Sequence, residues 1–157
     1  MNAEQTLAAV HRSVTVQAPI EKAFAVFTES FGSWWPTSHH VNPNGYETSY
    51  IEPAVGGRWY ERAPDGSEYD WGRVLAWDPP HRFLLTWQLS GEYVFESDHA
   101  SEVEITFTAE DDGRTRVDLV HSMFEGLTGS ETVAATVAGD NGWTMILARF
   151  AQAAEAA

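Results

Sequence analysis

The sequence predicts an α+β domain in which a curled, largely antiparallel sheet packs around one long C-terminal helix. The first observation is an apolar stripe near the C-terminus, with offsets that place all of its members on one helix face. A helix that exposed this stripe would not stay in solution alone, so it must be buried against a sheet. The second observation is a run of alternating segments joined by short turns, which favours antiparallel pairing. The stripe consists of Trp143, Ile146, Leu147, Phe150, Ala151 and Ala154.

The length and composition of the chain fit one folded domain. The 157 residues suit a single domain spanning residues 1–157, with a core between about residues 11 and 155. Hydrophobic residues make up 43% of the chain and aromatic residues 13%, including 7 Trp, which argues against disorder. These are more large rings than a minimal core requires, so the surplus predicts an aromatic-lined cavity.

The charge of the chain excludes two classes of partner. Lys and Arg number 9 against 23 Asp and Glu, giving a formal charge of -14, so nucleic acid and anionic membrane surfaces are repelled. Eight of the acids lie between Glu92 and Asp112 with no Lys or Arg among them. This run indicates a solvated acidic face, and a surface for a basic protein partner is the alternative.

Several absences predict a cytoplasmic location. The chain has no Cys, which excludes disulfides, thiolate metal sites and a Cys nucleophile. The segment from Met1 to His11 has neither a basic start nor a long apolar core, so we expect no signal peptide. No stretch approaches 18 apolar residues, so we expect no membrane span.

The N-terminal region predicts a strand, a short helix and an irregular segment. Alternating residues predict a half-buried strand over 11–17, which Pro19 ends. Helical spacing of apolar residues then predicts a helix over 19–29, with Pro in its first turn. Residues 31–40 follow no clean period and are interpreted as a loop or short helical turn, whose two adjacent Trp either cap a core edge or wall a pocket mouth.

The middle of the chain predicts sequential strands separated by turn residues. Pro64, Asp65 and Gly66 between two apolar runs predict a hairpin turn, and Asp78, Pro79 and Pro80 predict a further break. Residues 90–101 form a looser acidic stretch. The expected strands span residues 46–52, 57–62, 69–77, 82–89, 102–107 and 114–122.

Two positions are compatible with the start of the last helix. Thr128 and Glu131 have the spacing of a capping box, whereas the segment from Gly139 to Gly142 resembles a break just before Trp143. Either one helix runs from about residue 131 with a weak middle, or a new helix starts near residue 141. In both cases the missing Cβ of Gly142 allows a close approach to the sheet.

Five short motifs, taken with the order of the elements, carry a family resemblance. They are Val55-Gly56-Gly57-Arg58, Asp78-Pro79-Pro80-His81-Arg82, Thr86-Trp87, His121-Ser122 at a strand end, and Gly142-Trp143 at the start of the last helix. Over about residues 11–155 the chain resembles the activator of heat-shock-protein ATPase homologue family, within the SRPBCC (START and birch-pollen-allergen-like) superfamily. The resemblance implies a helix-grip fold with a deep cavity between sheet and helix. Superfamily members generally bind apolar molecules there, and some have become cyclases, aromatases or other enzymes.

Strand alternation and the family resemblance together predict which residues form the wall of the cavity. Each candidate taken singly is better explained as core, but as a set roughly a third are expected to touch a cavity, because a core of this size does not need so many Trp. The candidates are Trp34, Trp35, Trp59, Trp71, Trp87, Phe107, Leu119, Phe124, Trp143 and Met145.

Polar candidates for orienting a ligand or for catalysis are fewer. Arg73 either points into the cavity, where it would bind a carboxylate, or lies outside because the strand reverses its faces at a bulge. His121 shares an apolar face and is either a buried core residue or an acid–base group. Tyr60 is a third catalytic candidate. The remaining polar candidates are Arg58, His39 and His40. No ligand spacing for a metal occurs, so neither a metal nor an organic cofactor is expected.

Three functions remain open at this stage. The first is a module that binds a small apolar or aromatic molecule between sheet and terminal helix, with a stress-related role among the expectations. The second is an enzyme of the cyclase, dehydratase or lyase kind that uses the same cavity with Arg73, His121 or Tyr60. The third is a chaperone-associated interaction domain that uses the acidic residues. The sequence is compatible with a homodimer but does not require one.

Overall fold

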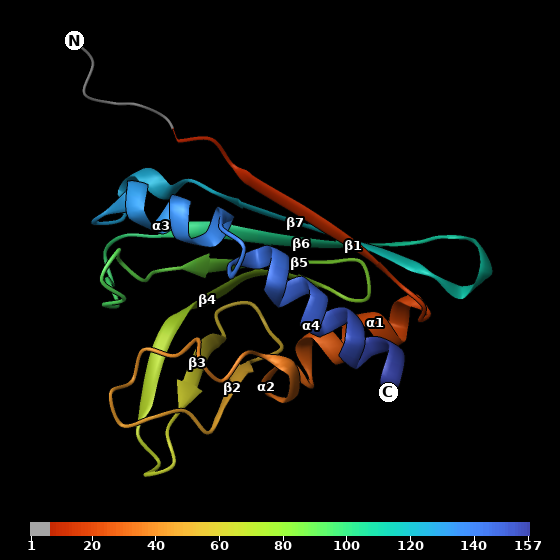
Figure 1. Ribbon diagram of the computed structural model, residues 1–157, viewed down its shortest axis with the longest axis horizontal. Helices are drawn as coiled ribbons and strands as arrows, with labels where there is room; N and C mark the ends of the chain where they lie inside the picture. Colours follow the sequence, from red (N-terminus) through yellow and green to blue (C-terminus); the bar gives the residue numbers. More distant parts are fainter. Residues whose placement is uncertain (1–6) are drawn as a thin grey trace.

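The computed structural model describes residues 7–157 and confirms the α+β helix-grip architecture (Figure 1). Seven strands form one antiparallel sheet in the order β1-β7-β6-β5-β4-β3-β2. The strands are β1 (Val10–Val16), β2 (Thr48–Ile51), β3 (Arg58–Arg62), β4 (Glu68–Asp78), β5 (Arg82–Trp87), β6 (Ser101–Ala109) and β7 (Thr115–Ser122). The sheet curls, so that β2 and β3 turn away from the plane of β6 and β7 (Figure 1).

The helices gather on one side of this sheet. Figure 1 shows α4 running across it beside α1, with α3 near the opposite end. The helices are α1 (Ile20–Thr28), α2 (Phe31–Trp34), α3 (Ser130–Ala138) and α4 (Trp143–Ala156), and the 3-10 turns are η1 (Asp111–Gly113) and η2 (Phe124–Gly126). Across residues 7–157, none of the helices has the length and apolar character needed to cross a membrane.

The last helical region confirms the apolar stripe and decides between the two alternatives for its start. A new helix, α4, begins at Trp143, and α3 is a separate helix that ends before Gly139. The capping box is wrong, because the N-cap of α3 is Gly129, no side chain caps it, and the Thr128 N–H donates to Glu96 instead. Five of the six stripe residues are buried, and Ala151 is partly buried.

The close approach expected at Gly142 exists but involves a different partner. A Cβ at this position would collide with the backbone carbonyl of Val137. Gly142 therefore lets α4 start directly against the last turn of α3, and not against the sheet as the sequence suggested. This contact fixes the position of Trp143, the first residue of α4.

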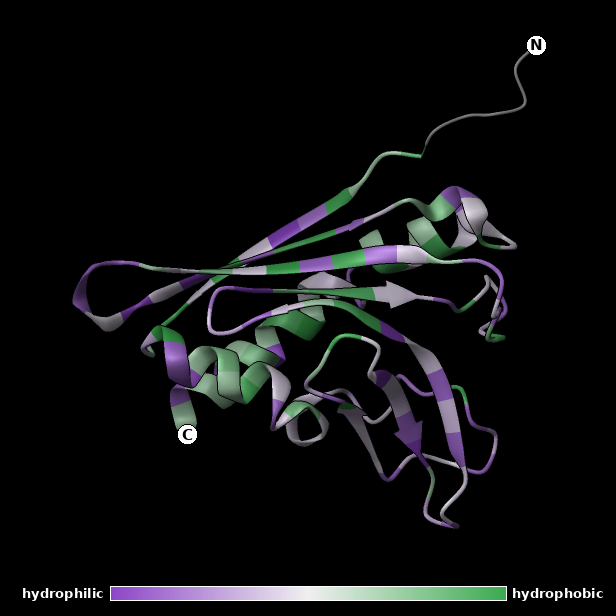
Figure 2. Ribbon diagram, turned by 180° about the vertical axis from the view of Figure 1, so that it is seen from behind, coloured by the Kyte–Doolittle hydropathy of each residue, from purple (hydrophilic) through white to green (hydrophobic). Residues whose placement is uncertain are grey.

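The central strands confirm the predicted alternation. On β6 and β7, every second residue is buried toward the helices and the residues between them are more exposed, and β5 follows the same pattern except that Thr86 is buried as well. Hydrophobic and hydrophilic residues accordingly alternate in colour along the central strands of Figure 2. The inward residues are Phe83, Leu85 and Trp87 on β5, Val103, Ile105 and Phe107 on β6, and Val117, Leu119 and His121 on β7.

Two bulges interrupt the alternation of β4. Pairing passes from Gly72 to Asp70 opposite β3 and leaves Trp71 as an extra residue. On the other side of β4, the pairing with β5 passes from Val74 to Ala76, so Leu75 is a second extra residue. Trp71 and Val74 are consequently buried, whereas Leu75 is 43% exposed. The faces of this strand therefore reverse, as one of the two alternatives for Arg73 requires.

One end of the interior is filled by phenylalanine rings. The ring centroids of contacting members lie 4.8 to 6.1 Å apart, and most pairs meet edge-on or tilted. We call this set the phenylalanine cluster; it consists of Phe24, Phe27, Phe83, Phe107 and Phe150.

The acidic run does not form one face, which corrects the sequence interpretation. Glu92 lies in the loop after β5, whereas Asp111 and Asp112 lie at the tip of the β6–β7 hairpin, at the other end of the sheet (Figure 1). In addition, Glu104 on β6 pairs with Arg82 on the neighbouring strand. The negative charge is therefore divided between two ends of the molecule.

Candidate functional site

A cavity of about 300 Å³ lies between the sheet, the start of α4 and the loop that follows α2. Four Trp from four different elements form its walls. Trp35 follows α2, Trp71 is the extra residue of the first β4 bulge, Trp87 ends β5, and Trp143 begins α4. The ring centroids of Trp35 and Trp71 lie 5.1 Å apart, and those of Trp87 and Trp143 lie 5.8 Å apart. The walls therefore present mainly aromatic surface.

Every indole N–H of these four rings donates to a protein acceptor. A tethered N–H fixes the orientation of its ring, and it leaves the ring faces and carbon edges, not the donor, available to a ligand. The donor–acceptor distances are 2.8 Å from Trp35 to the His39 carbonyl, 2.8 Å from Trp71 to Glu61 Oε1, 3.2 Å from Trp87 to the Leu89 carbonyl, and 3.1 Å from Trp143 to His121 Nδ1.

His121 supports two of these walls from behind. Because Trp143 donates to Nδ1, the proton of the neutral ring is on Nε2, which lies 2.8 Å from Ser101 Oγ. Ser101 in turn donates to the Trp87 carbonyl over 2.9 Å. Burial lowers the pKa of His121 to about 3, so the ring is neutral near pH 7. Both nitrogens are engaged, and the side chain does not line the cavity.

The mouth of the cavity is bridged by a hydrogen bond between its two rims. His39, in the loop after α2, donates from Nε2 to the Asn141 carbonyl in the α3–α4 connection over 2.8 Å. Its Nδ1 lies 2.9 Å from Ser38 Oγ. Within the described chain, no Asp, Glu, Lys or Arg lines the cavity. The lining therefore favours an uncharged occupant.

A few polar groups of the lining have no hydrogen-bond partner among residues 7–157 and are available to a ligand. His40 donates from Nδ1 to the Asn42 carbonyl over 3.1 Å, so its Nε2 is an acceptor when the ring is neutral. The other groups are the Tyr93 hydroxyl, the Thr136 hydroxyl and the Asn141 amide. These groups can orient a ligand within an otherwise apolar cavity.

The sequence matches the family described as Activator of Hsp90 ATPase homolog 1-like protein over residues 17–155. This chain belongs to that family. The match confirms the family resemblance seen in the motifs. Among proteins with curated descriptions, none matches this family member.

Solved structures similar to this family member agree with that assignment. One is an anthrahydroquino-γ-pyrone synthase, Txn09, with 39% identity, coverage of 94% of this chain and 97% of that chain, and a TM-score of 0.65. Another is the self-sacrificing resistance protein CalC from Micromonospora echinospora, with 32% identity, coverage of 94% of both chains and a TM-score of 0.70. Protein MLL2253 from Mesorhizobium loti, at 22% identity, 93% and 96% coverage and a TM-score of 0.66, shows the same fold.

The structure places four of the ten wall candidates of this family member around the cavity: Trp35, Trp71, Trp87 and Trp143. The other six do not line it. Trp34 packs against the phenylalanine cluster and donates its N–H to the Val26 carbonyl. The remaining five are Trp59, Phe107, Leu119 and Phe124, which are buried elsewhere in the core, and Met145 on α4. Ligand binding by any of them stays a prediction.

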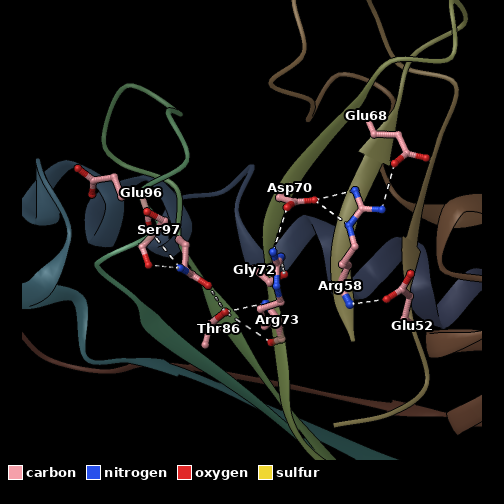
Figure 3. Close-up of polar contacts among 10 residues, drawn as sticks. Glu52, Arg58, Glu68, Asp70, Gly72, Arg73, Thr86, Glu96 and Ser97 are labelled. Carbon is pink, nitrogen blue, oxygen red and sulfur yellow. Dashed lines mark hydrogen bonds and ion pairs between the residues drawn. The ribbon is translucent and has the colours of Figure 1, made fainter. Parts of the chain in front are cut away.

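The polar candidates on β3 and β4 lie outside the cavity. The Arg73 side chain is 40% exposed and pairs with Asp70 at 3.2 Å, so the inward alternative is wrong (Figure 3). Arg58 pairs with Asp70 at 2.8 Å and with Glu68 at 3.0 Å. The Arg58 guanidinium also lies 3.9 Å from the centre of the Tyr60 ring. These side chains form an ion-pair network on the sheet that does not line the cavity.

Sequence reasoning missed several cavity residues and one supporting residue. Tyr93, Thr136 and Asn141 lie in loops or at a helix end, where no periodicity indicates direction. Glu61, which accepts the Trp71 N–H, was identifiable, because period two on β3 places it on the buried face of Trp59. An acid at an inward strand position is rarely fully buried unless other groups bind it.

Proposed function

We propose that this chain binds an uncharged, planar aromatic molecule in the tryptophan-walled cavity. The observation that carries the proposal is that four Trp line one cavity with their N–H groups bound to the protein. Such rings offer stacking and edge contacts, which planar aromatic ligands satisfy best. The absence of charged side chains in the described lining disfavours a charged ligand, which would lose its hydration without compensation.

The dimensions and polarity of the cavity narrow the ligand further. A volume of about 300 Å³ is at the small end of the range for ligand pockets and suits about two to three fused rings. The free groups of Tyr93, Thr136 and Asn141 can bind oxygen substituents on the ligand. Hydroxylated or carbonyl-bearing aromatic molecules therefore fit better than fatty acids.

A second candidate function is catalysis on a molecule held in the same cavity. Two observations favour it. One similar structure, at 39% identity, is described as a synthase, and His40, whose Nδ1 bonds to the Asn42 carbonyl, has an Nε2 with no hydrogen-bond partner among residues 7–157. Such a nitrogen can remove a proton from a ligand hydroxyl or acidic carbon. In this case His40→Phe abolishes product formation while ligand affinity falls only slightly.

The binding proposal is tested by native mass spectrometry of the purified protein, followed by Trp fluorescence titration. The panel contains naphthols, flavonoids and anthraquinones, with fatty acids as the apolar comparison. Saturable quenching by the aromatic compounds alone supports the proposal. A flat response to every compound, together with the mass of the bare chain, contradicts it.

A matched pair of variants locates the binding site. Trp87→Leu removes a wall ring and should weaken binding at least about tenfold, because one stacking partner is worth about 1.4 kcal/mol. Trp77→Leu removes a ring that packs on Phe24 outside the cavity and should leave affinity unchanged. Equal losses in both folded variants would contradict binding in this cavity. Liquid chromatography of the incubated ligand then separates simple binding from turnover.

A further inference from the structure

Glu61 is a fully buried acid for which the proposed binding function has given no role. Its side chain has 0% exposure and lies on the inward face of β3, beside Trp59. It does not line the cavity itself. Burying a carboxylate is costly unless hydrogen bonds replace its hydration, so its partners indicate what it does.

Among the described residues, three N–H groups donate to the Glu61 carboxylate, and two of them belong to the cavity-lining residues Val41 and Trp71. Oε1 accepts from the Val41 backbone N–H at 2.7 Å and from the Trp71 indole at 2.8 Å, and Oε2 accepts from the Asn42 backbone N–H at 3.2 Å. The hydrogen-bonding groups that reach the two carboxyl oxygens are all donors, which is the surrounding that suits an acceptor-only carboxylate. Within residues 7–157, Glu61 has no ion-pair partner.

The negative charge of Glu61 reaches a neighbouring group as well. Burial raises the pKa of Tyr46, and the charge of Glu61 adds to this rise. The Glu61 carboxylate therefore lies close enough to Tyr46 to disfavour a second negative charge there. Its nearest partners are the donors that it orients.

These bonds join two parts of the cavity wall that are far apart in sequence. Val41 lines the cavity and belongs to the loop that also carries His39 and His40, while Trp71 comes from the β4 bulge. One carboxylate thus fixes both the loop backbone and the ring beside it. Trp71 has no residue paired opposite it on β3, so the bond to Glu61 is the contact on this side that orients the indole.

The bond to Trp71 also changes the electronic character of the ring. A hydrogen bond from a neutral N–H to a carboxylate is charge-assisted, and it polarises the donor strongly at low local dielectric. Polarisation toward the ring makes the face of the indole more negative. Such a face attracts rings that are electron-poor, and it repels the negative faces of electron-rich rings.

We propose that Glu61 is a positioning residue that holds Trp71 and the 41–42 backbone in place and makes Trp71 an electron-rich wall. The cavity then prefers electron-poor aromatic rings conjugated to carbonyl groups, such as quinones, over electron-rich rings of the same size. This inference rests on the proposed binding function and names the ligand class for that site. The absence of Cys makes quinones usable probes, since no thiol is present to react with them.

The test compares 1,4-naphthoquinone with 1,5-dihydroxynaphthalene, which has the same ring system and opposite electron demand. The wild-type protein should bind the quinone about tenfold more tightly, a difference of about 1.4 kcal/mol. Stacking of the quinone on an electron-rich indole should also produce a charge-transfer absorption band. In Glu61→Gln the ratio of affinities should fall toward one, and the band should move to shorter wavelength. A loss of packing alone would weaken both ligands equally and would not move the band.

Two further variants make the result decisive. Trp71→Phe keeps an aromatic ring and both backbone hydrogen bonds to Glu61 but removes the indole N–H donor. It should therefore lower the affinity ratio as Glu61→Gln does. The double variant should lower the ratio little further than either single variant. Thr115→Val removes a buried hydrogen bond to the Ala18 carbonyl outside the cavity and should leave the ratio and the band unchanged. If Glu61→Gln does not fold, Trp71→Phe tests the electronic effect by itself.

The failures of the two proposals are distinguishable. Wild-type protein that binds neither probe, nor any member of the aromatic panel, contradicts the binding function and with it this inference. Wild-type protein that binds both probes equally, or a folded Glu61→Gln or Trp71→Phe variant that keeps the wild-type ratio and band, overturns the role of Glu61 alone.

Discussion

The two ends of the interior contain aromatic rings of different kinds, and only one end is hollow. At one end the phenylalanine cluster fills the space between α1, α4 and the sheet, with ring centroids as close as 4.8 Å. At the other end four Trp surround a cavity of about 300 Å³. Both ends are built from large rings on the same sheet, so ring size alone does not decide whether the interior closes.

The difference lies in the polar atom of the indole. Phe has no polar atom, so its rings move to the closest edge-to-face packing. Each cavity Trp is held by its N–H to a fixed acceptor, and these acceptors lie on three different segments of the chain: the loop after α2, the β-sheet and the segment that follows β5. The tethers resist collapse of the rings onto one another. The aromatic surplus in the composition is therefore divided between a packed core and a rigid wall.

The largest expected effect tests the packed end. Phe150→Ala should lower the free energy of unfolding by about 3–5 kcal/mol, because the ring is fully buried among Phe27 and Trp34 and its removal leaves a cavity. Urea denaturation measures this loss. Ligand affinity of the remaining folded protein should stay at the wild-type value. A smaller loss together with impaired binding would show that the two ends are one coupled unit.

The second prediction concerns the support of the walls and follows from the lowered pKa of His121. The unfolded chain binds a proton on this His below about pH 6.5, whereas the folded chain does so only near pH 3. Stability is therefore complete above pH 6.5 and falls as the pH is lowered toward 3, by about 1.4 kcal/mol per pH unit from this residue.

Denaturation of wild-type protein and His121→Gln across this pH range isolates the contribution. Gln cannot take up a proton, so the stability of His121→Gln should depend less on pH than that of the wild type. The difference between the two curves removes the carboxylates, which titrate in both proteins. Parallel curves would mean that His121 is protonated as easily in the folded state as in the unfolded state.

Much of the end that contains the phenylalanine cluster could be predicted from the sequence, because the spacing of apolar residues shows which side chains point into the core. The α4 stripe and the inward set of β5 were both found by counting residues. These elements have regular backbones, so spacing translates directly into direction. The exception on the sheet is β4, where the extra residue Trp71 reverses the faces; the sequence allowed a bulge but did not locate it.

The hollow end was harder to predict, because its geometry depends on contacts between distant segments. Trp35 and Trp143 were candidates, but Trp34 and Trp59 were equally plausible from their residue type. Trp34 donates its N–H to Val26 beside the phenylalanine cluster, and the buried Trp59 N–H has no acceptor among residues 7–157. No local pattern in the sequence reveals either placement. The burial of Glu61 was visible in the alternation of β3, but its three donors come from other segments.

The third prediction concerns a substitution that fills the cavity. Val137→Phe adds a ring from the last turn of α3 into the cavity and should weaken ligand binding at least about tenfold, while stability changes by about 1 kcal/mol or less, because the ring occupies existing space. Fluorescence titration and urea denaturation measure the two effects. Val120→Phe adds the same ring on the outward face of β7 and serves as the control. Unaltered binding in Val137→Phe would place the ligand elsewhere.

The smallest expected effect concerns the bond between the rims. His39→Ala removes the hydrogen bond to the Asn141 carbonyl and should change stability by less than about 1 kcal/mol, because the bond is solvent-exposed. Stopped-flow fluorescence should show association and dissociation of the ligand both accelerated about threefold, since the bridge is lost in the free and bound states alike. Ser38→Ala removes the contact to Nδ1 but keeps the bridge, and its rates should equal those of the wild type. If only dissociation accelerates in His39→Ala, the imidazole contacts the ligand directly. The binding surface would then include a hydrogen-bonding group beside the four Trp rings.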